Sequence, residues 1–439
     1  MALASALRGN CHIPDQSSTY PMYQAPRGTA DILPSDQRYW SFVSQTATAA
    51  AHAHGYRRID TPTFEDTMLF QRTVGEETDI VQKEMYNFED RGGQEITLRP
   101  EGTAAVCRAY LEHGLHNNAQ PTRLFYLCPM FRYDRPQAGR FRQFHQFGVE
   151  AIGDGDAAVD LEVIQLAMVT MERLGLGGMQ LVLNNIGDAE DRAAYIDALH
   201  EHFRPHLAHL GPDDRRRFDA NPLRLLDSKE LAGEAFMSDA PRSVDYLGPS
   251  AQAHWEELIG YLAALAIPYT LDHKLVRGLD YYTRTVFEVH PAREGAQSAV
   301  CAGGRYDGLI AQLGGDPTPG IGFAAGIERL IMNIQEQGAD IPASAPAPIV
   351  ITYRGPAAKA RAVSLATKLR AAELAALVAP ARSLKAQMRY ASALASPAVL
   401  ILGDQELERG TVTLRNMTTA DQQEVAAEGV HDKLRAMGL

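Results

Sequence analysis

One stretch, residues 124–150, constrains the fold of this chain more than any other. It reads LFYLCPMFRYDRPQAGRFRQFHQFGVE. Residues 124–131 form an apolar run of strand length that is rich in aromatic residues, and residues 141–150 suit a second strand. Between these two runs lie residues that together indicate a turn: Pro136, Ala138 and Gly139. The stretch therefore predicts two antiparallel strands joined by a long tip.

Positive charge is concentrated at this tip. The tip and its two bases carry four arginines: Arg132, Arg135, Arg140 and Arg142. A folded protein gains nothing by gathering four guanidinium groups unless an anion binds among them. Because a guanidinium fork matches phosphate and carboxylate oxygens two at a time, the sequence predicts an anion site here.

The returning strand presents an unusual face. Side chains alternate along a strand, so one face is expected to carry Arg142, Phe144, Gln146, Gly148 and Glu150. That face offers a cation, a ring, an amide, an open space and a carboxylate, which suits a small ligand with an ammonium and an acidic group. The alternative is a mixed, partly solvated face of an ordinary antiparallel sheet.

The hairpin resembles motif 2 of the class II aminoacyl-tRNA synthetases, and its sequence is similar to that of the histidyl-tRNA synthetase family. In that family the hairpin holds ATP, the amino acid and the acceptor end of the tRNA. The resemblance implies an α+β fold: a class II antiparallel sheet flanked by helices, with a helical insertion and a C-terminal α/β anticodon-binding domain. It covers nearly the whole chain after Ala25.

Two segments upstream of the hairpin fit the resemblance. Residues 35–54 predict a helix that ends at Gly55, and residues 56–62 predict a strand closed by Pro62. A helix followed by such a strand resembles motif 1, which implies a homodimer.

A third segment, residues 95–103, predicts a strand followed by the start of a helix. The free N–H groups at a helix N-terminus favour a carboxylate ligand. By resemblance, Glu101 and Thr103 contact the ammonium group of histidine. The alternative is that these two side chains only cap the helix.

Residues 275–289 predict a turn that leads into a strand, and their sequence resembles a motif of the histidine-specific enzymes. The resemblance places Arg277 over the α-phosphate and the substrate carboxylate, and Tyr281 and Tyr282 around the imidazole. Tyrosine supplies a ring face and a hydroxyl, and Glu150 can accept a hydrogen bond from a ring N–H. The alternative is a structural arginine and two core tyrosines.

Two glycine-rich segments follow. In residues 301–310 the glycines are expected to let the backbone approach a ligand. Residues 320–332 predict a strand of small residues that turns into a helix near Arg329. Their spacing fits neither a dinucleotide-binding fingerprint nor a P-loop. The segment resembles motif 3, which implies that Arg329 meets the γ-phosphate and adenine.

The resemblance implies a two-step reaction, in which histidine attacks the α-phosphate of ATP and the histidyl group then moves to tRNA(His). Arg132 and Arg277 would be the catalytic residues. Histidine would bind to Glu101, Thr103, Arg132, Gln146, Glu150, Arg277, Tyr281 and Tyr282. ATP, with Mg²⁺ on its phosphates, would bind to Arg132, Asp134, Arg140, Arg142 and Arg329. Asp134 departs from the glutamate usual in the family, and the acceptor end of the tRNA would meet Arg135 and Gln137.

The C-terminal part of the chain predicts a small α/β domain. We expect strands at residues 349–353, 398–402 and 411–416, the last at an edge, and helices at 357–374 and 382–393. Eight cations face a single acid, Glu373, between residues 354 and 389: Arg354, Lys359, Arg361, Lys368, Arg370, Arg382, Lys385 and Arg389. Such a surface suits RNA phosphates, as the resemblance implies, although solubilising charges are the alternative.

Composition limits the remaining options. A net charge of −12 argues against a protein that coats nucleic acid along its whole surface. No apolar run reaches membrane-spanning length, so no membrane partner is expected. The 14 histidines form no HExxH and the 4 cysteines form no CxxC, which predicts no protein-bound metal and reduced thiols in a cytoplasmic protein.

A chain of 439 residues should hold two or three domains. We expect a disordered tail at 1–24, a catalytic domain at 25–187 and 269–338, a helical insertion at 188–268, a linker at 339–348 and the anticodon-binding domain at 349–439. The run Arg215–Arg217 in the insertion is expected to be a solvated face rather than a tRNA contact.

Two other functions compete with this one. The first is a histidine-sensing regulatory subunit of ATP phosphoribosyltransferase, which lacks the C-terminal RNA domain and usually loses motif arginines. The second is a synthetase for another amino acid, such as proline or threonine. The retained arginines argue against the first, and the segment from Arg277 to Tyr282, together with Glu150, argues against the second.

Overall fold

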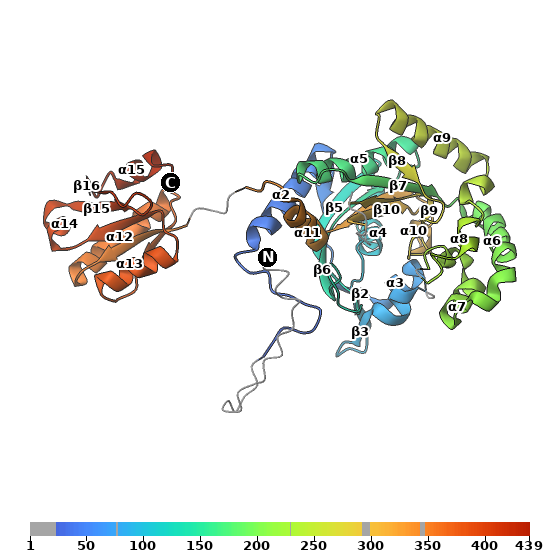
Figure 1. Ribbon diagram of the computed structural model, residues 1–439, viewed down its shortest axis with the longest axis horizontal. Coiled ribbons are helices and arrows are strands. Elements are labelled where there is room, and N and C mark those ends of the chain that lie inside the picture. Colours follow the sequence, from blue (N-terminus) through green and yellow to red (C-terminus); the bar gives the residue numbers. More distant parts are fainter. Residues whose placement is uncertain (1–22, 76–77, 229, 292–298, 343–346) are drawn as a thin grey trace. The chain divides into compact units, whose positions relative to one another are not determined.

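A computed structural model describes residues 23–75, 78–228, 230–291, 299–342 and 347–439 (Figure 1). The chain forms two compact units, Met1–Ile341 and Pro342–Leu439. Most of the predicted N-terminal tail (residues 1–22) and part of the predicted linker (343–346) lie outside the described residues. The finer domain boundaries stay predictions.

An eight-stranded sheet forms the centre of the first unit. Its strand order is β1-β5-β6-β11-β10-β9-β7-β8. Neighbouring strands are antiparallel except for the outermost pairs, β1 with β5 and β7 with β8, which are parallel. The bounds are Arg57–Arg58 (β1), Thr122–Phe131 (β5), Gln143–Ile152 (β6), Gly320–Gly326 (β11), Cys301–Arg305 (β10), Thr283–His290 (β9), Gln180–Asn185 (β7) and Tyr269–Leu271 (β8). The predicted antiparallel sheet is confirmed.

The predicted hairpin is β5 and β6, which pair from Thr122 opposite Ile152 to Phe131 opposite Gln143. The strand predicted at 56–62 was wrong in length, because β1 has only two residues. Arg99 accounts for the early end: its guanidinium donates to the carbonyls of Thr61 (2.7 Å) and Pro62 (3.0 Å), which a longer ladder would need.

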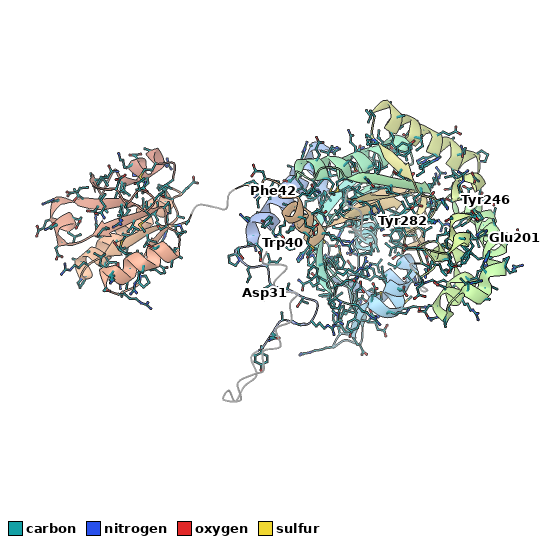
Figure 2. All side chains as sticks on the ribbon, viewed as in Figure 1. Asp31, Trp40, Phe42, Glu201, Tyr246 and Tyr282 are labelled. Atoms are coloured by element: carbon teal, nitrogen blue, oxygen red, sulfur yellow. The ribbon has the colours of Figure 1, made fainter. Side chains whose placement is uncertain are left out.

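Helices cover both faces of this sheet, and strand alternation divides the core between them. Phe125 and Phe147 point to one face and pack with α2 (Gln37–Ala53), α5 (Ala157–Arg173), α9 (Pro249–Ala264) and α11 (Ile327–Gln337). Tyr126 and Met130 point to the other face and pack with α4 (Thr103–Glu112) and α10 (Leu309–Gln312). Figure 2 marks Trp40 and Phe42 on α2.

A small sheet precedes the hairpin in the sequence. It has the order β2-β4-β3, with bounds Phe64–Asp66, Glu95–Leu98 and Tyr86–Glu89. Helix α3 (Thr67–Val74) follows β2, and a π-helical turn, η1 (Ile80–Glu84), precedes β3. Single π-helical turns occur often at functional sites.

The predicted helical insertion is helical and has a core of its own. Its elements are α6 (Ala189–Phe203), η3 (Arg204–His209), α7 (Pro212–Ala220), η4 (Pro222–Leu225), α8 (Ala235–Ser238), η5 (Ser243–Tyr246) and α9. Tyr195, Phe203 and Leu225 are buried in this separate core. Helix α9 differs, because its Trp255 and Leu258 belong to the core of the large sheet. Glu201 and Tyr246 mark the insertion in Figure 2.

The second unit confirms the predicted α/β domain. Its sheet has the order β13-β12-β14-β15-β16, with bounds Ala376–Val378, Ile349–Tyr353, Ala398–Leu402, Thr411–Asn416 and Gln422–Ala426. The prediction that 411–416 is an edge strand was wrong, because β16 pairs with it on its outer side. The polar composition of β16, with only one partly buried apolar side chain, gave no clear strand pattern.

The eight cations between residues 354 and 389 do not form one surface. Helix α12 (Pro356–Ala371) packs on one face of the sheet with α15 (Val430–Ala436), and α13 (Leu384–Ala393) packs on the other. Arg354, Lys359, Arg382 and Lys385 follow the carboxyl ends of the parallel strands β12 and β13. Lys368 and Arg370 lie at the far end of α12, about 15 Å from Lys359 along the helix axis.

A buried ion pair joins the large sheet to α5. Arg305 in β10 is fully buried and donates to the carboxylate of Asp160, to that of Asp307 (3.2 Å) and to the carbonyl of Asp154 (2.8 Å). Removing one partner of a fully buried pair leaves an uncompensated charge in a medium that solvates it poorly.

Asp160→Asn is therefore expected to lower the free energy of unfolding of the first unit by about 3 kcal/mol. Both tryptophans, Trp40 and Trp255, lie in that unit, so tryptophan fluorescence during urea unfolding follows it alone. The control is Glu162→Gln on the same helix, which weakens a half-exposed pair with Arg123 and should lower stability by less than about 1 kcal/mol. Equal losses in the two variants would contradict the assigned importance of the buried pair.

Candidate functional site

A cavity of about 720 Å³ opens against the large sheet in the first unit. It is lined by the hairpin, by the start of α4, by the segment between β8 and β9, and by parts of β9, β10 and β11. All but four of the predicted site residues line it, although they come from segments as far apart in the chain as Glu101 and Arg329. The exceptions are Arg135, Gln137, Arg142 and Glu150, and Glu150 contacts residues of the lining.

Glu150 on β6 is almost completely buried beside this cavity, with an exposed fraction of 1%. Its carboxyl group accepts hydrogen bonds from the hydroxyls of Thr103 (2.8 Å), Tyr126 (3.3 Å) and Tyr306 (2.5 Å). Burial raises the pKa of Glu150 to about 8, against the opposing effect of these donors. The group is therefore poised to change charge near neutral pH.

Three tyrosines surround Glu150 and form an aromatic pocket. The rings of Tyr281 and Tyr282 lie 4.7 Å apart, and Tyr306 packs edge-on to Tyr281 at 5.9 Å. Gln146, on the same face of β6, has a buried side-chain oxygen without a hydrogen-bond partner among the described residues. A flat ligand with N–H groups would find ring faces, a carboxyl group and a free acceptor together here.

Glu101 caps α4. Its carboxylate accepts from the backbone N–H groups of Thr103 (2.6 Å) and Ala104 (2.9 Å), and burial raises its pKa. Glu101 therefore does cap the helix, as the alternative interpretation expected. Both Glu101 and Thr103 also line the cavity, so capping fixes their positions without removing them from the site.

Two half-buried arginines in the cavity have no carboxylate partner within the described ranges. Arg132 donates to the carbonyl of Pro100 (2.9 Å) and lies 5.5 Å from the ring of Phe144. Arg329 donates to the carbonyls of Gly139 (3.1 Å) and Ala299 (2.8 Å). Burial lowers the pKa of both guanidinium groups, and the nearby positive charges of Arg140 and Arg132 lower that of Arg329 further. An anionic ligand would relieve this unfavourable concentration of positive charge.

Arg277 is in a different state, because it already has an acidic partner. It donates to the carboxylate of Glu288, which also accepts from His290 (2.8 Å). Burial would lower the pKa of Arg277, but the charge of Glu288 raises it above its ordinary value. The Nε atom of Arg277 is buried and has no partner among the described residues, so one donor remains available.

The hairpin tip divides its arginines between cavity and surface. Arg140 and Asp134 line the cavity and form a pair at 3.3 Å. Arg142 does not line it: its guanidinium stacks over the ring of Tyr133 at 3.8 Å and donates to the carbonyl of Asp134. The expected alternation fails at Arg142 because β6 begins only at Gln143. Arg135 and Gln137 are exposed at the tip.

Two glycines next to the cavity make room for protein side chains. A Cβ atom at Gly304 would lie 2.6 Å from the carbonyl of Thr285 and 2.9 Å from the ring of Tyr282. In β11, a Cβ atom at Gly322 would lie 2.1 Å from the carboxyl of Glu150. Gly304 and Gly322 therefore let Tyr282 and Glu150 reach their positions, and the expected approach of the backbone of residues 301–310 to a ligand stays a prediction.

Comparison with known proteins agrees with this geometry. Residues 28–330 match the family described as Histidyl-tRNA synthetase, and residues 348–437 match the Anticodon binding domain. A histidine–tRNA ligase of Dehalococcoides mccartyi is 53% identical over 403 residues, which cover 91% of this chain and 96% of that protein. The chain belongs to the histidyl-tRNA synthetase family.

Solved structures extend this family assignment. The apo histidyl-tRNA synthetase of S. aureus has 39% identity and a TM-score of 0.79, and the match covers 94% of this chain and 99% of that one. A Bacillus halodurans protein titled ATP phosphoribosyltransferase regulatory subunit/histidyl-tRNA synthetase has 24% identity, a TM-score of 0.62 and coverage of 87% and 98%, which shows the fold alone. The predicted class II fold is confirmed, and the chain is a class II aminoacyl-tRNA synthetase rather than the regulatory paralogue.

Sequence reasoning missed two groups of this family member's site. Tyr306 lies in the segment 301–310 but drew no attention beside its glycines, although its hydroxyl donates to Glu150. Glu288 lies in a strand that was predicted, but no role was predicted for its side chain. A signal was present, because Glu288 and His290 alternate with the buried Phe287 and Val289 and so share one face.

Arg216 and Arg217 also line the cavity, which the expectation of a solvated face did not include. Arg217 pairs with Asp214 at 3.0 Å and with Asp79 at 3.6 Å, so it joins the insertion to the segment before η1. Arg215 instead donates to the carbonyl of Leu210.

The raised pKa of Glu150 makes stability depend on pH. Because its folded pKa of about 8 lies above an unfolded value of about 4.3, the stability that this raised pKa contributes is fully present below about pH 4 and is lost as pH rises through about 8. Glu150→Gln cannot lose a proton, so its stability relative to the natural protein should improve between roughly pH 5 and pH 9. Urea unfolding followed by tryptophan fluorescence measures this, and a pH-independent difference would refute it.

Proposed function

We propose that this chain is a histidine–tRNA ligase that forms histidyl-adenylate from histidine and ATP in the cavity and transfers the histidyl group to tRNA(His). The observation that carries the proposal is the placement of a buried carboxyl in an aromatic pocket beside half-buried arginines that have no carboxylate partner among the described residues. The first part suits imidazole, and the second suits the carboxylate and phosphates that must meet it. No protein nucleophile is needed, because catalysis of both steps can come from positioning and charge stabilisation.

Histidine would bind at the hairpin end of the site. Its imidazole would pack against the rings of Tyr281 and Tyr282, with a ring N–H donating to the carboxyl group of Glu150. Its ammonium would donate to the free oxygen of Gln146 and to Glu101 and Thr103 at the start of α4. The fixed positions of these groups, each already held by a neighbour, support a pre-organised pocket.

ATP would place its phosphates among the cations. Arg132 would bind the α-phosphate and the histidine carboxylate, and Arg277 would stabilise the charge that develops during attack. Arg140 and Arg329 would hold the triphosphate and adenine. Arg142 stands outside the cavity in this structure, so its predicted contact with ATP requires a change of its side chain.

Asp134 would lie beside the adenine amino group where the family usually has glutamate. Its carboxylate accepts from the backbone N–H of Arg135 (2.6 Å) and from Arg140 (3.3 Å), which keeps the shorter side chain at the edge of the cavity. Magnesium would arrive with ATP on phosphate oxygens. The described residues contain no group of three His, Cys, Asp or Glu side chains placed to hold a metal.

The tRNA would meet the two units separately. Arg135 and Gln137, exposed on the hairpin tip, would contact its acceptor end. In the second unit we assign the anticodon contact to the cations at the carboxyl ends of β12 and β13, because they share one edge of the sheet: Arg354, Lys359, Arg382 and Lys385. Lys368 and Arg370 would take no part.

A homodimer in the cytoplasm completes the proposal. It rests on the resemblance of residues 35–62 to motif 1. Phe64 and Phe88, which are 53% and 46% exposed, lie on the adjoining small sheet and would suit such an interface. None of the helices within the described residues is long and apolar enough to span a membrane.

Amino-acid-dependent exchange of labelled pyrophosphate into ATP tests the activation step. With each of the twenty amino acids supplied in turn, we expect exchange with histidine alone, since only imidazole matches the pocket around Glu150. Histidine binding without exchange would favour the sensor function, and exchange with proline or threonine would refute the assigned specificity.

Arg277→Ala should reduce histidine-dependent exchange by about 100-fold to 1000-fold, because one donor to the developing charge is lost. Its urea unfolding should stay cooperative. The matched control is Arg242→Ala in the insertion, whose arginine pairs only with the exposed Asp245 and which should retain the exchange rate. Near-normal exchange by Arg277→Ala would remove Arg277 from the catalytic residues.

A further inference from the structure

The segment between β8 and β9, residues 272–282, carries three predicted substrate contacts on an irregular backbone. Arg277, Tyr281 and Tyr282 all line the cavity from this segment. It has no regular helix or strand, and few backbone bonds hold it, among them Asp272 to Leu183 (3.0 Å) and Asp280 to Val74 (3.1 Å). A loop of this kind needs other anchors if its side chains are to stay in place.

One anchor comes from the helical insertion. Arg224, in η4, donates to both carboxylate oxygens of Asp280 at 2.8 Å. The side chain of Arg224 is only 17% exposed and that of Asp280 is 37% exposed, so solvent weakens this pair less than a surface pair. Asp280 is also confined from behind, since a Cβ atom at Gly75 would come within 2.2 Å of it.

A second anchor acts on the backbone beside the aromatic pocket. Arg192, in α6 of the insertion, donates to the carbonyl oxygen of Tyr282. Burial lowers the pKa of Arg192, and the charges of Asp280 and Asp188 oppose that effect. The guanidinium therefore sits in the interface between the insertion and the segment rather than in solvent.

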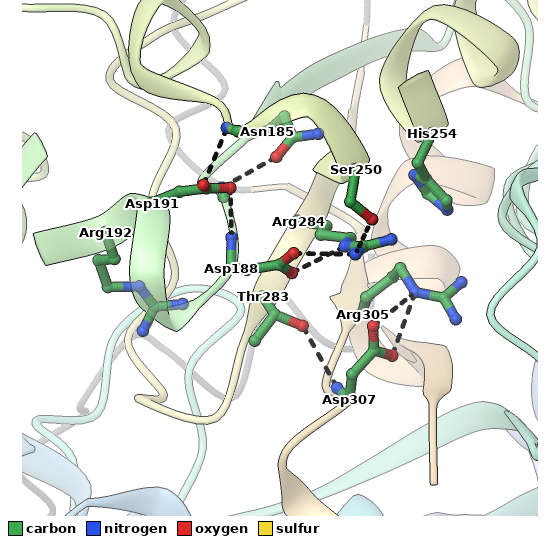
Figure 3. Close-up of polar contacts among 12 residues, drawn as sticks. Asn185, Asp188, Asp191, Arg192, Ser250, His254, Thr283, Arg284, Arg305 and Asp307 are labelled. Atoms are coloured by element: carbon green, nitrogen blue, oxygen red, sulfur yellow. Dashed lines mark hydrogen bonds and ion pairs between the residues drawn. The ribbon is translucent and has the colours of Figure 1, made fainter. Parts of the chain in front are cut away.

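A third anchor ties both ends of the insertion to β9 (Figure 3). Arg284 donates to the two oxygens of Asp188 (2.7 and 2.8 Å), at the start of the insertion, and to Ser250 (3.0 Å), in α9. Its backbone has a φ of +46°, which is unfavourable for a residue with a side chain. Such a conformation persists where the surroundings impose it, and here Asp188 and Ser250 do so.

Packing reinforces these polar contacts. Val276, next to Arg277, contacts both the core beneath the large sheet and the separate core of the insertion. The segment thus lies against the insertion at Val276, Asp280 and Tyr282, and Arg284 of β9 continues the contact.

We propose that the helical insertion positions the histidine-binding segment, with Arg224 and Arg192 as positioning residues that act through Asp280 and the backbone of Tyr282. Neither arginine is assigned a contact with histidine here; they set the places of Arg277, Tyr281 and Tyr282. This inference rests on the proposed function of the same cavity. It gives the insertion a role in amino-acid activation that does not depend on RNA.

The test is pyrophosphate exchange without tRNA, so that any RNA contact of the insertion cannot contribute. Arg224→Ala should raise the KM for histidine about tenfold to 100-fold, because small displacements of contacting groups have effects of that size. The KM for ATP should change less than about twofold, since Arg132, Arg140 and Arg329 are held elsewhere. Arg242→Ala, an arginine of the insertion that does not touch the segment, should match the natural protein in both constants.

Two further variants separate positioning from general damage. Arg224→Lys keeps the charge but cannot bind both oxygens at once, so it should fall between Arg224→Ala and the natural protein. Asp280→Asn keeps the size of the side chain and should reproduce the Arg224→Ala effect. The double variant Asp280→Asn with Arg224→Ala should raise the KM for histidine little more than either single variant, because both changes remove the same ion pair.

The outcomes discriminate clearly. An unchanged KM for histidine in both Arg224→Ala and Asp280→Asn overturns the inference, as does an equal rise in the KM for ATP. If Arg224→Ala loses cooperative unfolding, Asp280→Asn decides the matter. Exchange by the natural protein and by Arg242→Ala supports the proposed function independently, whereas its absence from both would refute that function rather than the positioning role. Calorimetric titration of each variant with histidine supplies a readout that needs no turnover.

Discussion

The burial of one carboxyl group, that of Glu150, sets the conditions for the rest of the site. A buried acid is unfavourable unless donors surround it, and Thr103, Tyr126 and Tyr306 supply them from three separate elements. Those side chains fit around it because two nearby strand positions are glycines. A Cβ atom at Gly148 would lie 2.2 Å from the Tyr126 ring, and a Cβ atom at Gly322 would lie 2.1 Å from the carboxyl of Glu150 itself. The glycine pattern, the tyrosines and the acid are therefore one structural solution, in which changing any member disturbs the others.

The cations of the cavity follow the opposite logic. Arg132 and Arg329 are held by backbone carbonyls, which orient a guanidinium without neutralising it. Their lowered pKa values reflect desolvation first and the nearby positive charges second, and a polyanionic ligand would offset both. Arg277 is instead neutralised by Glu288, and its Nε atom has no partner among the described residues. The cavity thus contains two kinds of arginine, one held by carbonyls without neutralisation and one paired with an acid.

Local pattern and resemblance together predicted much of this arrangement from the sequence. Period-two alternation placed Gln146 and Glu150 on one face of β6, and the motif order indicated which distant segments meet. What escaped prediction depends on long-range contacts. Arg142 left the expected face because the strand starts at Gln143, two residues later than predicted, and the strand predicted at 56–62 ended early because Arg99 takes its carbonyls. Glu288 and Tyr306 gain their importance only from partners 11 and 156 residues away in the chain, Arg277 and Glu150. The strand β16 has too polar a composition to stand out.

The contacts of residues 272–282 add a consequence for how specificity is maintained. A pocket wall built on a strand gains rigidity from its ladder of hydrogen bonds, whereas this wall is held at its start by Asn184 of β7 and, nearer the tyrosines, by side chains of a separately packed helical core. The positions of Tyr281 and Tyr282 then depend on the stability of the insertion, and a disturbance of η4 or α6 would reach the pocket through Arg224 and Arg192. Arg216 and Arg217 of the same insertion also line the cavity, so the element that would position the proposed histidine-binding wall is itself part of the lining. One element thus both supports this wall and borders the cavity.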